Sequence, residues 1–100
     1  MSELMVTRND ADHRYEGTRD GDQAVIEFHL REDTEPTVMV MTHTEVPSSM
    51  RGQGVGSELV RKALDDVRER GETVLSECPY VSRWLEEHPD YQDLQAPAAA

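Results

Sequence analysis

The chain has 100 residues, of which 36% are hydrophobic, and this content suffices for one modest core and therefore for one domain. Its formal net charge of -11 at pH 7 argues against sequence-independent binding to DNA or RNA, because that affinity comes mostly from lysine and arginine side chains. The sequence contains no uncharged apolar run near the roughly 18 to 20 residues of a membrane span, and its first residues do not resemble a signal peptide. We therefore expect a cytoplasmic protein with neither membrane nor nucleic-acid partners.

Residues 4–8 alternate between apolar and polar side chains, which predicts a first strand. Residues 14–19 and 23–32 flank a turn-forming segment centred on Gly21, so they are expected to form a hairpin. The run at residues 38–41 is apolar on both faces, as in a central strand, and it continues through Val46.

The second half of the chain reads as a helix, a strand and a second helix. Apolar residues recur at helical spacing over residues 54–70, and residues 73–76 favour a strand. Residues 79–87 favour a short helix, and we expect residues 95–100 to be a disordered tail after a single domain that covers residues 1–94.

The predicted fold class is α/β (α+β), with a mixed sheet in the order β-β-β-β-α-β-α. The first strands are expected to be antiparallel, since a hairpin connects them. The strand, helix, strand unit requires a right-handed crossover, so the last strand should lie parallel to the central one.

Positive charge is concentrated in one stretch of the chain. Half of the basic residues lie between positions 51 and 70, whereas residues 1–36 and 72–100 are strongly acidic. This charge would create a positive potential beside the neighbouring glycine-rich segment. Basic side chains near the carboxyl end of a helix also complement its dipole, and this second explanation holds equally well for all five residues except Arg51. The acidic remainder could favour a cationic amine acceptor, although high negative charge often serves only solubility.

A glycine-rich loop follows the predicted central strand. Backbone N–H groups at a helix amino terminus lack intrahelical partners, and Gly52, Gly54 and Gly56 would let an anion approach them. Arg51 adds a charged donor and Gln53 a neutral one. The loop has neither a P-loop ending nor dinucleotide-fold spacing. On its own it indicates a diphosphate site, or glycines that serve only chain reversal.

The loop Arg51-Gly52-Gln53-Gly54-Val55-Gly56 resembles the Arg/Gln-x-x-Gly-x-Gly/Ala coenzyme A signature of the GCN5-related N-acetyltransferases. Three further stretches, at residues 43–47, 78–81 and 88–91, resemble the small single-domain branch of that family. The resemblance covers residues 14–94.

The resemblance implies acetyl-CoA as the acyl donor and an unidentified amine, either a small molecule or a protein lysine, as the acceptor. Backbone groups near Val46 would pair with the pantetheine arm, and the amides from Gly52 to Gly56 would hold the pyrophosphate, with Arg51, Gln53 and Val55 in the same site. The thioester would lie where the two parallel strands splay apart. Larger relatives have additional helices that bind the acceptor, and this sequence lacks them.

Cys78 precedes Pro79, a residue favoured at the first position of a helix, and a helix amino terminus stabilises a thiolate. The resemblance implies a catalytic cysteine here, although free cysteines are commonly small buried hydrophobes. Two mechanisms stay open: an acetyl-Cys78 intermediate, or direct attack by the amine with Cys78 as the acid.

His43 is the second catalytic candidate. It is expected to face the same cleft as Cys78, where an imidazole can take a proton near neutral pH, and Glu45 could orient it. A strand histidine can equally serve only in hydrogen bonding. Many larger relatives use a tyrosine of the last helix as general acid; Leu85 takes its approximate place here, with Tyr80 nearby but offset.

The single cysteine and the histidine spacing argue against a metal site. Cys78 can form neither an internal disulfide nor a site with several thiolates, which fits a reducing compartment. His13, His29 and His88 show no recognised metal spacing with it, so no metal is expected.

The sequence therefore predicts an N-acetyltransferase. A non-catalytic acyl-CoA-binding or regulatory module is the alternative, and a protein-interaction domain without cofactor is a third reading.

Overall fold

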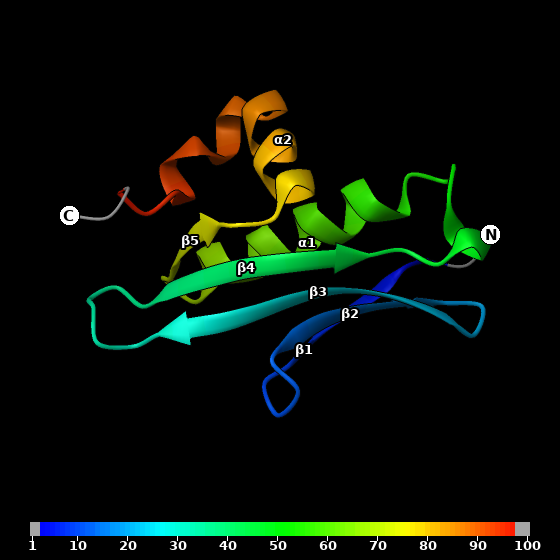
Figure 1. The fold of residues 1–100 in the computed structure, drawn as a ribbon, viewed down its shortest axis with the longest axis horizontal. Coiled ribbons are helices and arrows are strands. Elements are labelled where there is room, and N and C mark those ends of the chain that lie inside the picture. Colours follow the sequence, from blue (N-terminus) through cyan, green and yellow to red (C-terminus); the bar gives the residue numbers. More distant parts are fainter. Residues whose placement is uncertain (1–2, 98–100) are drawn as a thin grey trace.

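A computed structural model describes residues 3–97 of the chain. Four strands, a helix, a fifth strand and a second helix follow one another, as the sequence predicts (Figure 1). The elements are β1 (Met5–Asn9), β2 (Arg14–Arg19), β3 (Asp22–Arg31), β4 (Val38–Glu45), the 3-10 helix η1 (Ser48–Met50), α1 (Val55–Glu69), β5 (Thr73–Ser76), α2 (Pro79–Glu87) and the 3-10 helix η2 (Pro89–Leu94). None of the helices in the described part is long and apolar enough to cross a membrane.

The five strands form one sheet in the order β1-β2-β3-β4-β5. The first four are antiparallel to their neighbours, and β5 is parallel to β4, which confirms the predicted mixed sheet. The hairpin of β2 and β3 turns at Asp20 and Gly21, both of which have positive φ. Gly21 is a residue suited to this conformation, because it has no Cβ.

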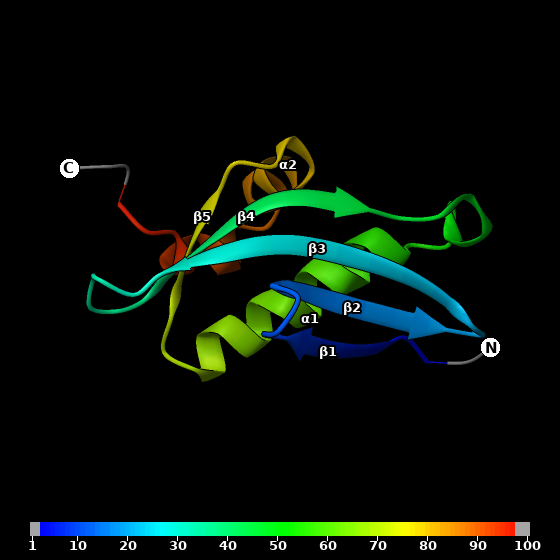
Figure 2. The ribbon, with the colours of Figure 1, turned by 60° about the horizontal axis from the view of Figure 1, so that its bottom comes forward.

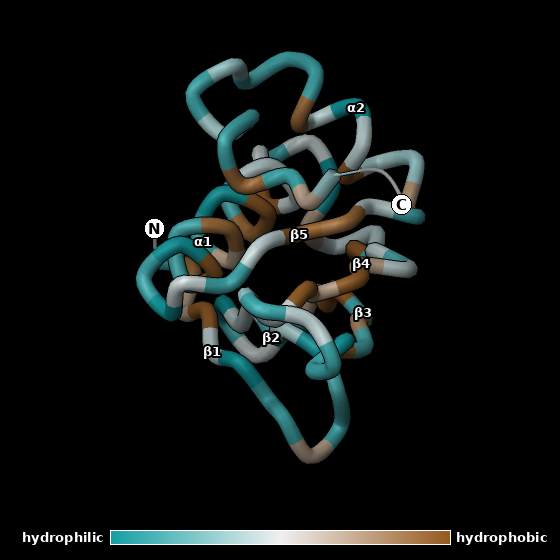
Figure 3. Tube along the Cα trace, turned by 90° about the vertical axis from the view of Figure 1, so that its left-hand side faces the viewer, coloured by the Kyte–Doolittle hydropathy of each residue, from teal (hydrophilic) through white to brown (hydrophobic). Residues whose placement is uncertain are grey.

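The core lies between the sheet and the two helices. On β3, Ala24, Ile26 and Phe28 are buried on one face, and the predicted stripe of α1 packs against it. The buried side chains of α2, Val81, Trp84 and Leu85, belong to the same cluster, so both helices cover the same face of the sheet (Figure 2). Hydrophobic positions of α1, β4 and β5 accordingly lie toward the interior (Figure 3).

A β-bulge interrupts the pairing of β3 with β4. Phe28 pairs with Met41, whereas the preceding Glu27 pairs with His43, so that Thr42 is an additional residue on β4. Side chains alternate between the two faces of a strand, and one extra residue reverses the alternation. Met41 and Thr44 therefore share the face that the helices cover, and His43 lies on the other face.

The parallel pair separates at its carboxyl ends. The register joins Val38 to Thr73 and ends with Met41 opposite Ser76, while β4 continues to Glu45. One more hydrogen bond, from the Glu77 N–H to the Met41 carbonyl at 2.8 Å, follows the last pair. The later residues of β4 thus leave β5 and lead to the glycine loop.

The end of the described chain differs from the expected tail. Gln95 forms a parallel bridge with Val74, and the Ala96 N–H donates to the Val74 carbonyl at 2.8 Å. The prediction of a disordered tail from residue 95 is therefore wrong for these two residues, because the outer edge of β5 offers unpaired backbone groups that they satisfy. Residues 98–100 lie outside the described part.

Candidate functional site

The glycine loop, residues 51–56, connects η1 to the first turn of α1. Gly52 and Gly54 have φ values of 78° and 74°, in the left-handed region where a Cβ is unfavourable. Gly54 is the N-cap of α1, and the first intrahelical bond runs from the Glu58 N–H to its carbonyl at 3.0 Å. The amides of the preceding three residues have no helical acceptor, so this end of α1 is suited to an anion.

Gly56 leaves room for a side chain of α2. It is buried in the first turn of α1, and a Cβ added there would collide with the Tyr80 hydroxyl. Tyr80 belongs to the first turn of α2, and its side chain is 47% exposed. The hydroxyl of an accessible tyrosine therefore lies against the amino terminus of α1.

A cavity of about 310 Å³, here called the loop cavity, opens beside the glycine loop. All the predicted cofactor-binding residues except Gln53 line it: Val46, Arg51, Gly52, Gly54, Val55 and Gly56. Thr44, Met50 and Tyr80 complete the lining, and the sequence analysis had assigned none of these three to the site. The sequence signals for Tyr80 are its place near the general-acid tyrosine of larger relatives and its position two residues after Cys78, at the start of a helix.

Arg51 and Val46 contact each other across the loop. The Arg51 Nε donates to the Val46 carbonyl at 3.2 Å, which leaves the terminal nitrogens of the guanidinium for other acceptors. The carbonyl of Val46, near which a ligand is expected to pair, thus already accepts one hydrogen bond and keeps a second lone pair. Arg51 is held at the mouth of the cavity by this bond.

The side chain of Gln53 connects the loop to two neighbouring segments. Its Nε2 donates to the Ser49 carbonyl at 3.2 Å, and its Oε1 accepts a hydrogen bond from Arg19 at the end of β2. Arg19 is 34 residues away in the sequence, so only the folded sheet brings its charge to the loop.

Cys78 is the N-cap of α2 and is 4% exposed. Its Sγ lies 3.4 Å from the Thr44 Oγ1, and either atom can be the donor. The Cys78 carbonyl accepts hydrogen bonds from the Ser82 N–H at 2.9 Å and the Ser76 hydroxyl at 3.0 Å. Because Thr44 lines the loop cavity, the thiol lies directly behind that lining.

The structure does not bring His43 together with Cys78. The bulge at Thr42 places His43, opposite Glu27, on the exposed face of β4, and Glu45 shares this face. The expectation that His43 faces the same cleft as Cys78 is therefore wrong, because simple alternation from Met41 would have turned it inward. Thr44 occupies the inward position instead.

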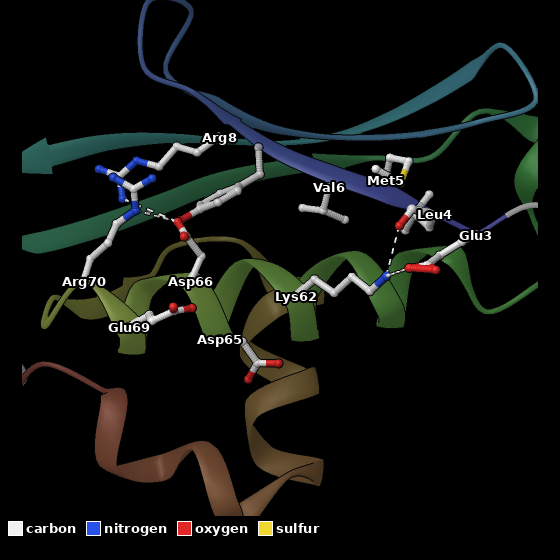
Figure 4. A pocket seen from close by; sticks show the side chains of 11 residues that line it. Glu3, Leu4, Met5, Val6, Arg8, Lys62, Asp65, Asp66, Glu69 and Arg70 are labelled. Carbon is white, nitrogen blue, oxygen red and sulfur yellow. Dashed lines mark hydrogen bonds and ion pairs between the residues drawn. The ribbon is translucent and has the colours of Figure 1, made fainter.

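A larger cavity of about 370 Å³ lies between β1 and α1, away from the glycine loop (Figure 4). Its polar groups bond to one another: the Tyr15 hydroxyl donates to Asp66 at 2.6 Å, and Arg70 donates to the same carboxylate at 2.7 Å. Arg8 forms an ion pair with Glu72 at 2.8 Å. These bonds connect the edge of the sheet to α1. None of the predicted site residues lines this cavity.

A model of the family described as GCN5-related N-acetyl-transferase matches residues 14–94, which is most of the chain. The chain belongs to the GCN5-related N-acetyltransferase family.

Within residues 3–97, no group of three or more His, Cys, Asp or Glu side chains is arranged to hold a metal ion.

Among curated relatives, this family member is 34% identical over 74 residues to Protein NATD1 of Gallus gallus, and equally to those of Mus musculus and Homo sapiens. The match covers 74% of this chain but 64%, 64% and 63% of those relatives, so the chain spans just under two thirds of their length.

Two solved structures share the fold. A GCN5-like protein from Staphylococcus aureus is 24% identical with a TM-score of 0.69, and the match covers 99% of this chain and 94% of that one. A ribosomal-protein-alanine N-acetyltransferase from Brucella melitensis is 19% identical with a TM-score of 0.52, over 87% and 63% of the two chains. At these identities the likeness concerns the fold alone.

Proposed function

We propose that this protein is an acetyl-CoA-dependent N-acetyltransferase that acetylates an amine. The observation that carries the proposal is the loop cavity, where a positive-φ glycine loop, the free amides of α1 and Arg51 meet a lining that backs onto a thiol. A diphosphate fits this lining chemically, because backbone amides and a guanidinium are its usual donors and Gly52 and Gly54 keep Cβ atoms out of its approach.

Each part of the site has a distinct task. The amides from Gly52 to Gly56 and Arg51 would hold the pyrophosphate, and the separated strands β4 and β5 would admit the pantetheine arm. Acetyl-CoA, when bound, supplies an acetyl thioester. The thioester would end beside the thiol of Cys78 and the hydroxyl of Thr44, whose Sγ and Oγ1 atoms are 3.4 Å apart.

Two routes use Cys78. In the first, Sγ attacks the thioester carbon, coenzyme A leaves as the thiol, and the amine then takes the acetyl group and regenerates Cys78. In the second, the amine attacks directly and the Cys78 thiol gives its proton to the departing thiolate. The contact of Sγ with Thr44 suits both routes, since the hydroxyl can donate to a thiolate or accept from a thiol.

A non-catalytic acyl-CoA-binding module is a second candidate function. The observation that favours it is the separation of His43 from Cys78, which leaves the thiol without the predicted imidazole base. An acceptor amine that arrives already deprotonated would need no such base, and the enzyme would then act without His43.

Binding is tested first, by calorimetry with acetyl-CoA. Heat of binding and a raised Tm are expected, and their absence would overturn both candidate functions. Radiolabelled acetyl-CoA and mass measurement then separate them: an enzyme acetylates an amine in a panel of small amines and lysine peptides, or forms a labile adduct that Cys78→Ala abolishes. Binding without turnover and without adduct would leave the binding module.

A further inference from the structure

The end of the sheet opposite the glycine loop contains a further cavity, here called the distal cavity. It measures about 400 Å³, within the range of about 300 to 1,000 Å³ that is usual for small-molecule pockets. The connection between β3 and β4 lines it through Thr34, Glu35 and Pro36, and the last described segment lines it through Ala96 and Pro97. Both segments lie at the same end of the sheet, away from the glycine loop (Figure 1). The distal cavity is therefore separate from the site proposed for acetyl-CoA.

The base of the distal cavity is the face of the sheet that neither helix covers. Arg31, Val38 and Thr73 pair side by side across β3, β4 and β5, and all three line the cavity. Side chains alternate along a strand, and Met39 belongs to the core beneath the helices, so this row lies on the other face. Leu75, two residues after Thr73, lines the cavity from the same face. Aliphatic side chains of two strands thus give the cavity an apolar base.

Two opposite charges border the distal cavity. Arg31 and Glu35 are the charged side chains of its lining, and both are exposed. Within residues 3–97 neither of them forms an ion pair, although they border the same space. Glu32 and Asp33 of the same connection do not line the cavity. The cavity therefore offers one guanidinium and one carboxylate beside an apolar surface.

The two hydroxyl groups of the lining already donate within the protein. The Thr34 Oγ1 donates to the Pro36 carbonyl at 3.0 Å, and the Thr73 Oγ1 donates to the Thr37 carbonyl at 3.4 Å. Each hydroxyl has one proton, so neither is left to donate to a ligand. An uncharged polar ligand thus finds no hydroxyl donor here, whereas a ligand with both charges finds a partner for each.

We propose that the distal cavity binds a free aliphatic amino acid such as leucine. Its carboxylate pairs with Arg31, its ammonium group pairs with Glu35, and its side chain packs against Val38 and Leu75. A guanidinium is a strong donor to a carboxylate, and burial of the aliphatic side chain adds hydrophobic stabilisation. A ligand with one charge would leave one of the two protein charges beside its like or without a partner, so the pair selects a zwitterion. This inference goes beyond the proposed function and does not depend on acetyl-CoA.

Titration of the isotope-labelled chain with L-leucine, followed by NMR, tests the proposal. Saturable shifts are expected at Val38, Thr73 and Leu75. Two analogues with the same branched carbon chain each lack one charge: isocaproate lacks the ammonium group, and isoamylamine lacks the carboxylate. Each analogue should bind about fivefold more weakly than leucine, which is the effect of one partly exposed ion pair.

Variants assign each charge to its partner. Arg31→Met should remove the preference for leucine over isoamylamine, and Glu35→Gln should remove the preference over isocaproate. Arg61→Met and Glu32→Gln are the matched controls, because Arg61 is exposed on α1 and Glu32 does not line the cavity. Both controls should keep both preferences. Since Arg31 and Glu35 are exposed, their replacement should leave the Tm unchanged.

The absence of saturable shifts with leucine at the distal cavity overturns the proposal. Equal affinity for the three compounds also overturns it, because the cavity would then be an apolar surface without charge recognition. The proposal fails as well if Arg31→Met or Glu35→Gln keeps its preference, or if a control variant loses one, since the charge of the whole chain would then account for it. Calorimetry with acetyl-CoA is a separate measurement, so failure of this inference is distinguished from failure of the proposed function.

Discussion

Gly54 is the residue whose backbone conformation determines the shape of the loop. Its φ of 74° is in the left-handed region, yet no atom lies within 4 Å of the place that a Cβ would take. A substitution therefore acts through backbone strain and not through a collision. Gly71, after the end of α1, has a φ of 72° and equally open surroundings.

This pair allows a matched experiment on the loop. Gly54→Ala and Gly71→Ala should each reduce the free energy of unfolding by about 1 kcal/mol, the cost of a left-handed non-glycine residue. Only Gly54→Ala should weaken acetyl-CoA binding, by several-fold, because it shifts the amides of the loop. Chemical denaturation and calorimetry measure the two effects. Equal affinity of the two variants would show that the left-handed turn at Gly54 does not organise the binding site.

Thr44 is predicted to act on the Cys78 thiol. Thr44→Val keeps the side-chain shape but removes the hydroxyl 3.4 Å from Sγ, so Cys78 acetylation should slow several-fold while acetyl-CoA affinity stays nearly unchanged. The control is Thr42→Val, whose hydroxyl donates to the Glu27 carbonyl. The rate at which the Cys78 adduct forms, measured by mass spectrometry, checks this prediction. Equal rates in the two variants would show that Thr44 takes no part in the reaction.

At the scale of elements, two tyrosines tie outer segments to neighbouring carboxylates of α1. Tyr15 of β2 donates to Asp66 at 2.6 Å, and Tyr91 of η2 donates to Asp65 at 2.8 Å. Burial raises the pKa of Tyr15 well above its usual range, and the bond to Asp66 raises it further. Burial and the bond to Asp65 likewise raise the pKa of Tyr91. The Tyr91 ring also lies edge-on to the Trp84 ring, with the centroids 5.0 Å apart, so η2 contacts both α1 and α2.

These bonds predict a loss of stability in alkali. Phenols of the unfolded chain ionise near pH 10, whereas folding keeps both tyrosines protonated, so their contribution is complete below pH 10 and falls as the pH rises above it. The free energy of unfolding, measured from pH 8 to 11, should fall less steeply in Tyr15→Phe than in the unaltered protein. At pH 8 that variant should lose about 1 kcal/mol, the value of one hydrogen bond. Identical slopes would contradict the assignment.

The elements differ in how far their sequence determines them. The apolar period of α1 is visible in its own residues, and its stripe from Val55 to Val67 is buried as predicted. The bulge at Thr42 cannot be seen in the residues of β4 alone, because its position depends on how β3 and β4 pair. The same distinction applies to the candidate site. The residues of the glycine loop could be predicted from their own spacing, whereas Arg19 and Tyr80 lie at the site only because β2 and α2 pack there in the folded chain.

At the scale of the molecule, the site and the last described residues lie at opposite ends. The glycine loop follows the carboxyl end of β4, and the segment at Gln95 and Ala96 lies beside β5 at the other end of the sheet (Figure 1). Stability and binding can therefore be changed separately.

Ala96→Pro tests this separation. Proline has no N–H, so the bond to the Val74 carbonyl is lost and the free energy of unfolding should fall by about 1 kcal/mol. Acetyl-CoA affinity should stay unchanged. Ala96→Ser keeps the N–H and serves as the control in chemical denaturation. If the proline and serine variants unfold alike, the pairing beside β5 contributes nothing to the stability of the fold.

The extra residue in β4 has one more consequence, for comparison between relatives. Thr42 is the extra residue, so deleting it would restore regular pairing while His43 stays opposite Glu27 and Thr44 stays opposite Ile26. A relative without the extra residue would thus present the same strand position to the thiol. In such a relative that position lies one residue closer along the chain to the start of the strand, so a gap-free alignment across this strand would assign the wrong neighbour to the thiol.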